Sequence, residues 1–457
     1  MKVILIDPPP KRYIEHHDSR KYPHLGLAYI AAYVKAQGIN VQVIDSKFER
    51  LDMTQVEQRL IQTGPDIVGI SAMTHEIHQA GEVATLAKKH FPNVIAVIGG
   101  VHATALPERT VTEFPIFDFA VYGEGEISFY ELISSISKNS SYENIKGIVF
   151  RTPNGVRRNE PRELIADLDE LPPPAWELFP RAEEYPIMTA RGCPFQCNFC
   201  MRVMGNKLRK RTVQNVYAEL AYCIDTYQPR LIHFLDETFT IDKKNLNQLL
   251  DKMLEAGMEK KINWDAQTRS DVADYELFKK MRESGCVWLG IGVESGNQEI
   301  LKASGKGIFL EQVTTAIGMA KKAGLKTDGY FILGHPNETK QTATDTINFA
   351  AKLNPTKITI GIMTPYPGTD IFDMATKGEG GYKLISTDWS DYNKNIGNSL
   401  EMTTLPRKDL EKLQMLGYIK FYLHNFRLIS GAQYFFSQWR LGLSILKKYI
   451  LSRGRAK

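Results

Sequence analysis

Three of the five cysteines in this 457-residue chain lie close together, as Cys193, Cys197 and Cys200. Their C-x3-C-x2-C spacing places three thiols on one short loop. As thiolates they can bind three irons of a [4Fe–4S] cluster and leave the fourth iron open to a small ligand. The sequence therefore predicts an iron–sulfur site at this loop.

A structural zinc site is the alternative interpretation of the same cysteines. Zinc would need a fourth protein ligand, and the chain has no histidine between His102 and His233. Cys223 and Cys286 could supply that ligand, but each falls inside an apolar pattern that is typical of a core.

The elements that position the cysteines are predicted to form a partial barrel over residues 183–395. Strand and helix patterns alternate there in six β/α units, short of the eight that close a barrel. The cysteine loop follows the first predicted strand, at the end where barrel active sites lie. Polar residues end the next three strands, namely Asp236, Glu237, Gln267, Arg269, Glu294 and Ser295. Ordinary salt bridges and a solvated acidic turn would give the same pattern.

An earlier α/β unit is predicted for residues 1–137. Five short apolar strands separated by helices indicate a doubly wound parallel sheet of the flavodoxin-like, or Rossmann-like, type. Ligands of such sheets lie beyond the carboxyl ends of the strands. Residues 138–182 have the proline and turn residues of a β-hairpin followed by a linker. Residues 396–457 form a basic, aromatic region that is expected to be helical.

The cysteine loop, with Phe199 before its last cysteine, resembles the hallmark of the radical S-adenosylmethionine (SAM) superfamily over approximately residues 185 to 370. The resemblance implies that SAM chelates the open iron. It also implies that cleavage of SAM gives a 5′-deoxyadenosyl radical, which takes a hydrogen atom from an unactivated carbon. By the same resemblance, the SAM amino group contacts Asp236 and Glu237. The ribose and carboxylate contacts would come from Gln267, Arg269, Glu294 and Ser295.

The order of the two α/β units resembles the cobalamin (B12)-binding subgroup of that superfamily. This subgroup contains methyltransferases and the anaerobic magnesium-protoporphyrin cyclase. The matching stretches are "PHLGLAYIAAYV", "DIVGISAMT", "VIGGVHATALPE" and "VYGEGE". The resemblance implies that Ser71, Gly99 and Gly100 line a slot for the nucleotide tail of cobalamin.

One departure from the cobalamin-binding pattern concerns the loop after the first strand. The signature Asp-x-His-x-x-Gly is absent there, so no histidine is predicted to reach the cobalt. Either cobalamin binds without that ligand, or the domain has lost the cofactor and serves as a lid.

The net charge of +5 is concentrated at the carboxyl end. Residues 412–457 contain nine Lys or Arg and no acidic residue, which leaves −4 for the rest of the chain. A basic stripe on a folded body would suit nucleic acid, so this distribution argues against that partner. The aromatic residues of the tail suit contact with an anionic membrane surface, or equally a helical cap on the barrel.

The start "MKVILIDPPP" lacks a signal-peptide core, and no apolar run reaches the roughly 18 residues that span a bilayer. A cytoplasmic enzyme is therefore expected, with contact to a membrane surface as one of the two alternatives for its tail. The main hypothesis is a cobalamin-dependent radical SAM methyltransferase. It would act on a small-molecule or lipid substrate and receive electrons from a flavodoxin or ferredoxin. A radical cyclase, rearrangement or dehydration enzyme on a lipid or tetrapyrrole is the alternative, and a non-catalytic iron–sulfur sensor is the third.

Overall fold

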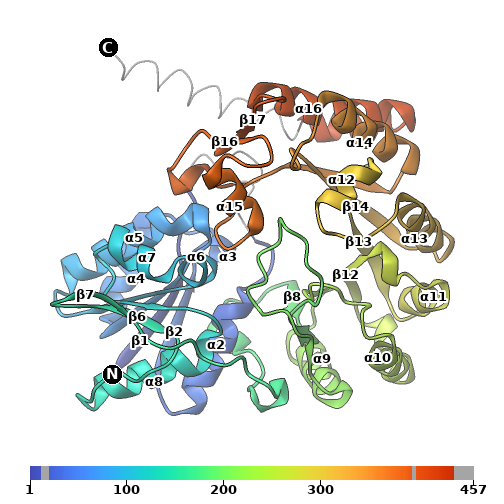
Figure 1. Ribbon diagram of the computed structural model, residues 1–457. Coiled ribbons are helices and arrows are strands. Elements are labelled where there is room, and N and C mark those ends of the chain that lie inside the picture. Colours follow the sequence, from blue (N-terminus) through green and yellow to red (C-terminus); the bar gives the residue numbers. More distant parts are fainter. Residues whose placement is uncertain (12–19, 394–397, 437–457) are drawn as a thin grey trace.

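Two parallel sheets set the architecture of the computed structural model, which describes residues 1–11, 20–393 and 398–436 (Figure 1). The first sheet has the order β2-β1-β3-β4-β5-β6-β7. Its first five strands run parallel, and the last two form a hairpin that pairs antiparallel with β5. The strands are β1 (Lys2–Asp7), β2 (Asn40–Asp45), β3 (Ile67–Ser71), β4 (Ile95–Gly99), β5 (Phe119–Val121), β6 (Ile148–Thr152) and β7 (Gly155–Arg158).

Helices cover both faces of the first sheet, and for this reason its central strands β1 and β3 are apolar on both faces rather than alternating. Val3 and Leu5 of β1 share a core with α2 and α8, whereas Ile4 and Ile6 share one with α4 and α5. The helices are α2 (Leu25–Ala36), α3 (Ser46–Glu49), α4 (Met53–Thr63), α5 (Ile77–His90), α6 (Val101–Ala105), α7 (Pro107–Glu113) and α8 (Gly125–Ser137), with the 3-10 turn η1 (Thr74–Glu76).

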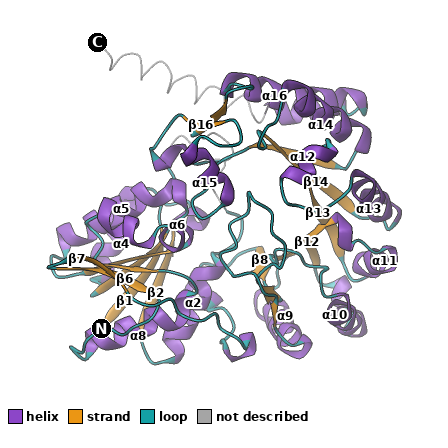
Figure 2. Cartoon of the chain, in the orientation of Figure 1, coloured by secondary structure: helices purple, strands orange, loops and turns teal. Residues whose placement is uncertain are grey.

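The second sheet has six parallel strands in the order β15-β14-β13-β12-β11-β8. Figure 2 shows these strands on the inside of an open arc, with helices along its outer side. The strands are β8 (Glu184–Ile187), β11 (Leu231–Phe234), β12 (Asn263–Arg269), β13 (Cys286–Glu294), β14 (Lys326–Leu333) and β15 (Lys357–Ile362). The structure thus confirms an α/β fold with a flavodoxin-like domain followed by a partial barrel.

Helices connect the barrel strands in sequence order, so each crossover returns the chain to the end of the sheet where the parallel strands begin. Two short strands, β9 (Ala190–Arg191) and β10 (Arg209–Lys210), pair antiparallel outside the main sheet. The helices of the barrel are α9 (Val213–Tyr227), α10 (Lys243–Glu255), α11 (Tyr275–Glu283), α12 (Gln298–Ala303), α13 (Leu310–Lys322) and α14 (Lys340–Leu353).

Beyond β15 the chain leaves the β/α pattern. It forms α15 (Asp370–Lys377), the hairpin β16 (Tyr382–Leu384) and β17 (Leu400–Met402), the turn η6 (Trp389–Asp391) and α16 (Arg407–His424). Part of the predicted basic region is therefore helical, while residues 437–457 lie outside the described residues. In the described ranges, no helix has both the length and the apolar character that crossing a bilayer requires.

Candidate functional site

The three clustered cysteines lie on the loop between β9 and β10, after the first barrel strand. Cys193 and Cys197 are partly buried and Cys200 is exposed, and all three are free thiols. Gly192 closes the loop with a φ of +92°, and a Cβ there would lie 2.2 Å from the carbonyl oxygen of Lys207. A side chain at that position would therefore open the base of the loop.

The donor set of this loop fits a [4Fe–4S] cluster. Desolvation raises the pKa of the Cys200 thiol to about 11, and charge repulsion from the neighbouring Cys197 and Cys193 contributes to the rise. Within the described residues, no three His, Cys, Asp or Glu side chains converge on a position for one metal ion. A cubane needs no such convergence because each thiolate binds a different iron.

The alternative of a structural zinc lacks a fourth ligand among the candidates that the sequence offered. Cys223 and Cys286 are fully buried in the hydrophobic core, on α9 and β13. Burial also raises the pKa of both thiols, that of Cys223 to about 12. Buried apolar surroundings of this kind are typical of inert structural cysteines.

Asp236 and Glu237 lie just beyond β11, after Leu235, and the structure gives them different surroundings. Asp236 is buried, and its carboxylate accepts hydrogen bonds from the backbone and hydroxyl groups of Thr189 and from the Ala190 amide, at 2.6 to 3.1 Å. Glu237 is exposed at the same strand end. Asp236 thus ties β11 to the start of the cysteine loop. Partial desolvation of the Glu237 carboxylate raises its pKa, although a backbone contact with Gly192 acts in the opposite direction.

Arg269, at the end of β12, contacts the cysteine loop. Its guanidinium lies over the Phe195 ring at 3.6 Å and donates to Cys197 Sγ at 3.6 Å. It also donates to the carbonyl oxygen of Lys306 at 2.6 Å and forms an ion pair with Asp271 at 2.9 Å. Burial raises the pKa of the Cys197 thiol overall, whereas the positive charges of Lys306 and Arg269 oppose that effect by favouring the thiolate, the form that binds metal.

The end of β13 carries Glu294 in a left-handed backbone conformation, with a φ of +68°. Its buried carboxylate forms an ion pair with Lys306. Ser295 is fully buried, and its hydroxyl contacts Thr346 Oγ1 at 3.0 Å and accepts from the Asn297 amide at 3.1 Å. These bonds hold the turn together, so the contact of Ser295 with SAM stays a prediction.

Two further predicted residues flank this site. Gln267 is exposed on β12, two positions before Arg269 and therefore on the same side of the strand. The Phe199 ring meets the edge of the buried His335 ring, with centroids 5.8 Å apart. His335 at the end of β14 was not singled out by sequence reasoning, because an isolated histidine after a strand carries no motif.

At the carboxyl ends of the central strands of the first sheet, Ser71 and Gly99 are direct neighbours in the pairing of β3 with β4. Gly100 follows with a φ of +90°, and a Cβ there would lie 2.9 Å from Ser71 Oγ and from the backbone of Ala72. The three predicted cobalamin residues thus form one narrow strip of small side chains at the carboxyl ends of two strands. Gly100 therefore lets the chain turn closely against Ser71 and Ala72, and the strip presents no large side chain at the strand ends, where nucleotide ligands of such sheets lie.

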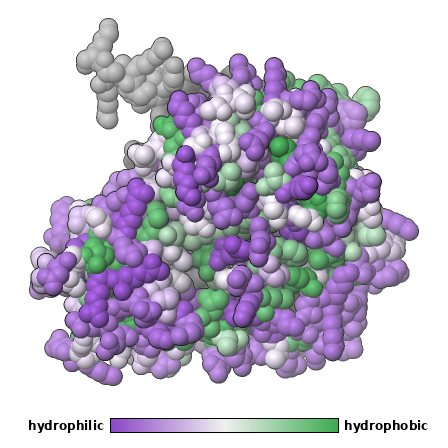
Figure 3. Space-filling view, in the orientation of Figure 1, coloured by the Kyte–Doolittle hydropathy of each residue, from purple (hydrophilic) through white to green (hydrophobic). Residues whose placement is uncertain are grey.

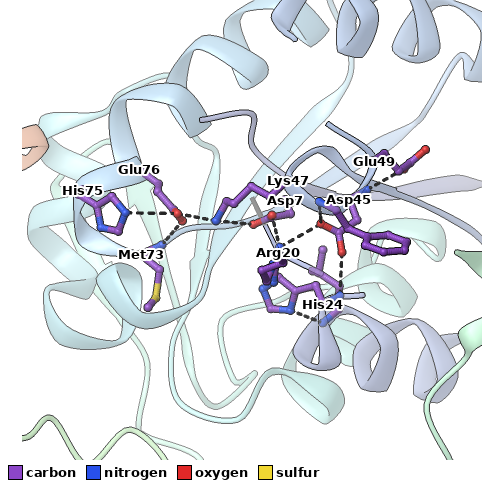
Figure 4. A network of polar contacts seen from close by, with 11 residues as sticks. Asp7, Arg20, His24, Asp45, Lys47, Glu49, Met73, His75 and Glu76 are labelled. Carbon is purple, nitrogen blue, oxygen red and sulfur yellow. Dashed lines mark hydrogen bonds and ion pairs between the residues drawn. The ribbon is translucent and has the colours of Figure 1, made fainter. Parts of the chain in front are cut away.

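The loop after β1, where the cobalamin signature is missing, carries buried ion pairs instead (Figure 4). Arg20 contacts both Asp7 and Asp45, and Lys47 lies 3.1 Å from Asp7 and also contacts Glu76. Burial raises the pKa of Asp45 to about 7, even though Arg20 acts in the opposite direction. Each of these groups has a partner of opposite charge, so removing one of them would leave a buried charge without its partner.

A second set of buried ion pairs joins the two domains, and sequence reasoning missed it. Arg191 contacts Glu124 at 2.9 Å and Glu126 at 2.7 Å, while Arg209 contacts Glu124 at 2.8 Å. The two arginines lie on β9 and β10, which close the cysteine loop. The glutamates belong to the stretch "VYGEGE" of the first domain, so this stretch anchors the base of the loop.

Figure 3 shows hydrophobic side chains along the junction of the two lobes on the face in view, bordered by hydrophilic ones. An apolar junction between two polar strand ends can exclude water from a reacting substrate.

Comparison with known proteins gives two domain matches and whole-chain relatives. Residues 19–133 match the B12 binding domain family, and residues 187–350 match the Radical SAM superfamily. A protein of Pyrococcus horikoshii, named as an uncharacterized methyltransferase, is 36% identical over 93% of each chain. The anaerobic magnesium-protoporphyrin IX monomethyl ester cyclase of Rubrivivax gelatinosus is 28% identical over 88% of this chain and 74% of its own.

A solved structure shares the whole fold. The radical S-adenosylmethionine methyltransferase TsrM from Kitasatospora setae, with cobalamin and a [4Fe–4S] cluster bound, matches with a TM-score of 0.71 at 17% identity. The match covers 93% of this chain and 88% of that one. The order and arrangement of the two domains are thus similar in both proteins.

Proposed function

Because this chain belongs to the radical SAM superfamily and to its subgroup with an amino-terminal B12-binding domain, we propose that it transfers a methyl group to an unactivated carbon of a small molecule. The observation that carries the proposal is the 36% identity to a protein named as a methyltransferase over 93% of both chains. A match of that extent includes both cofactor regions in the same order. It also argues for an enzyme rather than a sensor with a structural cluster.

In the proposed site, Cys193, Cys197 and Cys200 hold the cluster, and the strip of Ser71, Gly99 and Gly100 receives the cobalamin tail. When bound, the cluster and SAM supply radical chemistry at carbon, and cobalamin supplies a transferable methyl group. The protein's own contribution is to bind, to orient and to exclude water.

The side chains around the loop have distinct proposed tasks. Arg269 holds positive charge beside Cys197, and the exposed Glu237 accepts hydrogen bonds from the ammonium group of SAM. Asp236 positions the loop rather than the ligand, since Thr189 and Ala190 already occupy its carboxylate. The contacts of Gln267, Glu294, Ser295 and Phe199 with SAM remain part of the proposal.

The test uses the full chain, reconstituted without oxygen, with hydroxocobalamin, dithionite and SAM that carries a CD3 methyl group. We expect a bound-cobalamin absorption spectrum, 5′-deoxyadenosine, and the CD3 label on cobalamin by mass spectrometry. Cys200→Ala should abolish 5′-deoxyadenosine but leave cobalamin binding intact, because the two sites lie on different domains. A wild-type protein that binds no cobalamin would refute methyl transfer.

A radical cyclase is the second candidate, favoured by the 28% identity to the magnesium-protoporphyrin cyclase over 88% of the chain. The same experiment separates the two. Cobalamin binding and 5′-deoxyadenosine without any CD3 label on cobalamin would favour the cyclase. Both candidates require a small-molecule substrate and a strongly reducing electron donor, for which we propose a flavodoxin or ferredoxin.

We also propose that the enzyme lies in the cytoplasm and contacts an anionic membrane through its carboxyl end. Leu423, Phe426 and Ile429 expose 58%, 90% and 78% of their surface, and the chain is free of acidic residues from Lys412 onward. Basic and apolar groups together suit an anionic lipid surface. The protein should sediment with phosphatidylglycerol vesicles, whereas Phe426→Ser/Ile429→Ser should not. Equal sedimentation with phosphatidylcholine vesicles would contradict this proposal.

A further inference from the structure

The loop Pro365–Thr369, between β15 and α15, lies where the cysteine loop and the first domain meet. Gly368 has a φ of +82°. A Cβ on Gly368 would lie 3.3 Å from Met201 Cε and 3.5 Å from Ala105 Cβ. Met201 directly follows Cys200, and Ala105 ends α6, the helix that starts after Gly100. One glycine therefore separates the cluster loop from the helix at the cobalamin strip.

A backbone hydrogen bond ties the same segment to the cluster loop. The amide of Ile371, in the first turn of α15, donates to the carbonyl oxygen of Asn198 at 3.2 Å. Asn198 lies between Cys197 and Phe199. Its own amide donates to the carbonyl oxygen of Ser304 at 3.0 Å. The cluster loop is thus bonded to α15 on one side and to the end of α12 on the other.

Aromatic packing ties the segment to the first domain. Tyr366 and Phe372 pack against the hydrophobic core that contains α4 and α5. The Phe372 ring stacks on the Trp389 ring at an interplanar angle of 30° with centroids 6.5 Å apart, and Trp389 Nε1 donates to Glu113 at 2.7 Å. Figure 1 shows α15 beside α6, at the junction of the two domains. The segment therefore contacts both the cysteine loop and the first domain.

We propose that Pro365–Phe372 is a spacer that sets the distance between the two cofactor loops, with Gly368 as its positioning residue. This inference rests on the proposed function, because spacing matters only if both cofactors serve one reaction. A misplacement of about 1 Å can cost on the order of 100-fold in rate when reacting groups must be aligned. Glycine at the contact lets the two loops approach closely, because a Cβ would push the Met201 side chain aside by a few tenths of an ångström and would fill the remaining space next to Ala105.

The test compares Gly368→Ala with Gly38→Ala in the reconstituted full chain. Gly38 has a φ of +81° and no atom within 4 Å of a Cβ, so its substitution adds the same backbone strain without a contact. Both variants should bind iron and cobalamin as the wild type does. Gly368→Ala alone should weaken the spin–spin interaction between the reduced cluster and cob(II)alamin in electron paramagnetic resonance spectra. Its yield of CD3 label on cobalamin per 5′-deoxyadenosine should fall about threefold, because the new Cβ displaces its neighbours by only a few tenths of an ångström.

A relief variant makes the test specific for spacing. Met201→Ala removes the nearest atoms to the new Cβ, so Gly368→Ala/Met201→Ala should regain most of the spin coupling and of the label ratio, relative to Met201→Ala alone. If Gly368→Ala matched Gly38→Ala in both readouts, the inference would be wrong. Loss of iron or cobalamin from Gly368→Ala without rescue would also overturn it, since that result indicates a folding role. A wild type without bound cobalamin would instead refute the proposed function.

Discussion

Replacing Lys47 by Met should destabilise the first domain by leaving buried carboxylates without a cation. Lys47 Nζ lies 3.1 Å from Asp7 and also contacts Glu76, and all three side chains are nearly inaccessible to solvent (Figure 4). Burial lowers the pKa of Lys47, but Glu76 and Asp7 outweigh that effect and raise it above its ordinary value. The ammonium group is therefore charged in the folded protein, and Met, which has a similar shape, removes only the charge.

The expected loss of stability depends on the partners that Asp7 and Glu76 keep after the substitution. At an effective dielectric constant of about 20, the 3.1 Å contact with Asp7 corresponds to an attraction of about 5 kcal/mol, most of which offsets desolvation. Removing one partner of a buried pair typically costs about 3–5 kcal/mol. Asp7 keeps Arg20, and Glu76 keeps the Met73 amide at 3.0 Å, so we expect the lower end of that range.

The assay is thermal unfolding of the full chain at pH 7, followed by scanning calorimetry. A loss of about 3 kcal/mol should lower the midpoint of the transition that includes the first domain by about 6–12 °C. Adding Glu76→Gln to Lys47→Met should recover at least half of the loss, because the stranded charge disappears while an acceptor for the Met73 amide remains. A loss below about 1 kcal/mol, or a double variant no more stable than Lys47→Met, would refute the reasoning.

Three further outcomes are expected. Burial raises the pKa of Asp45 to about 7, so the folded state binds one more proton than the unfolded state between about pH 4 and 7. The free energy of unfolding should therefore fall by up to about 1.4 kcal/mol for each unit of rising pH. Asp45→Asn should flatten this slope in melting curves measured from pH 5 to 8. Gly192→Ala should reduce bound iron and sulfide to less than half of wild type after reconstitution, while Gly38→Ala should retain both; equal contents would contradict the assigned role of Gly192 in closing the loop. Glu237→Gln should weaken SAM binding at least about tenfold by calorimetry, through loss of a charge-assisted hydrogen bond, and unchanged affinity would exclude this contact.

Features that depend on local sequence could be predicted. The strand "KVILID" is apolar on both faces because helices cover both sides of its sheet, and an apolar run of this kind is visible without knowledge of the fold. The cysteine spacing likewise specifies a donor set through neighbours in the chain. For the same reason, the carboxyl ends of the strands could be identified as the polar edges of both sheets.

Contacts between distant residues could not be predicted. The pair Asp236 and Glu237 shows the limit, because sequence treats the two carboxylates alike while the structure buries one against Thr189. Glu124 and Glu126 stand 65 or more positions from Arg191, and no periodicity links them. Their stretch resembles a cofactor motif, and only the tertiary structure shows that it anchors the cysteine loop to the first domain.

The segment between the two sheets, part of residues 138–182, helps to set where the two cofactor regions lie. Its prolines indicated a linker, yet Trp176 is only 2% exposed, and the Ala175 amide donates to the carbonyl oxygen of Ala28 in α2 at 3.2 Å. One hydrophobic cluster runs from α2 through Trp176 into the barrel. A continuous core resists displacement of one domain relative to the other. The distance between the carboxyl ends of the two sheets is therefore set by side-chain packing rather than by a flexible linker. Substitutions at this junction should therefore change the coupling between the cofactors before they change the affinity for either one.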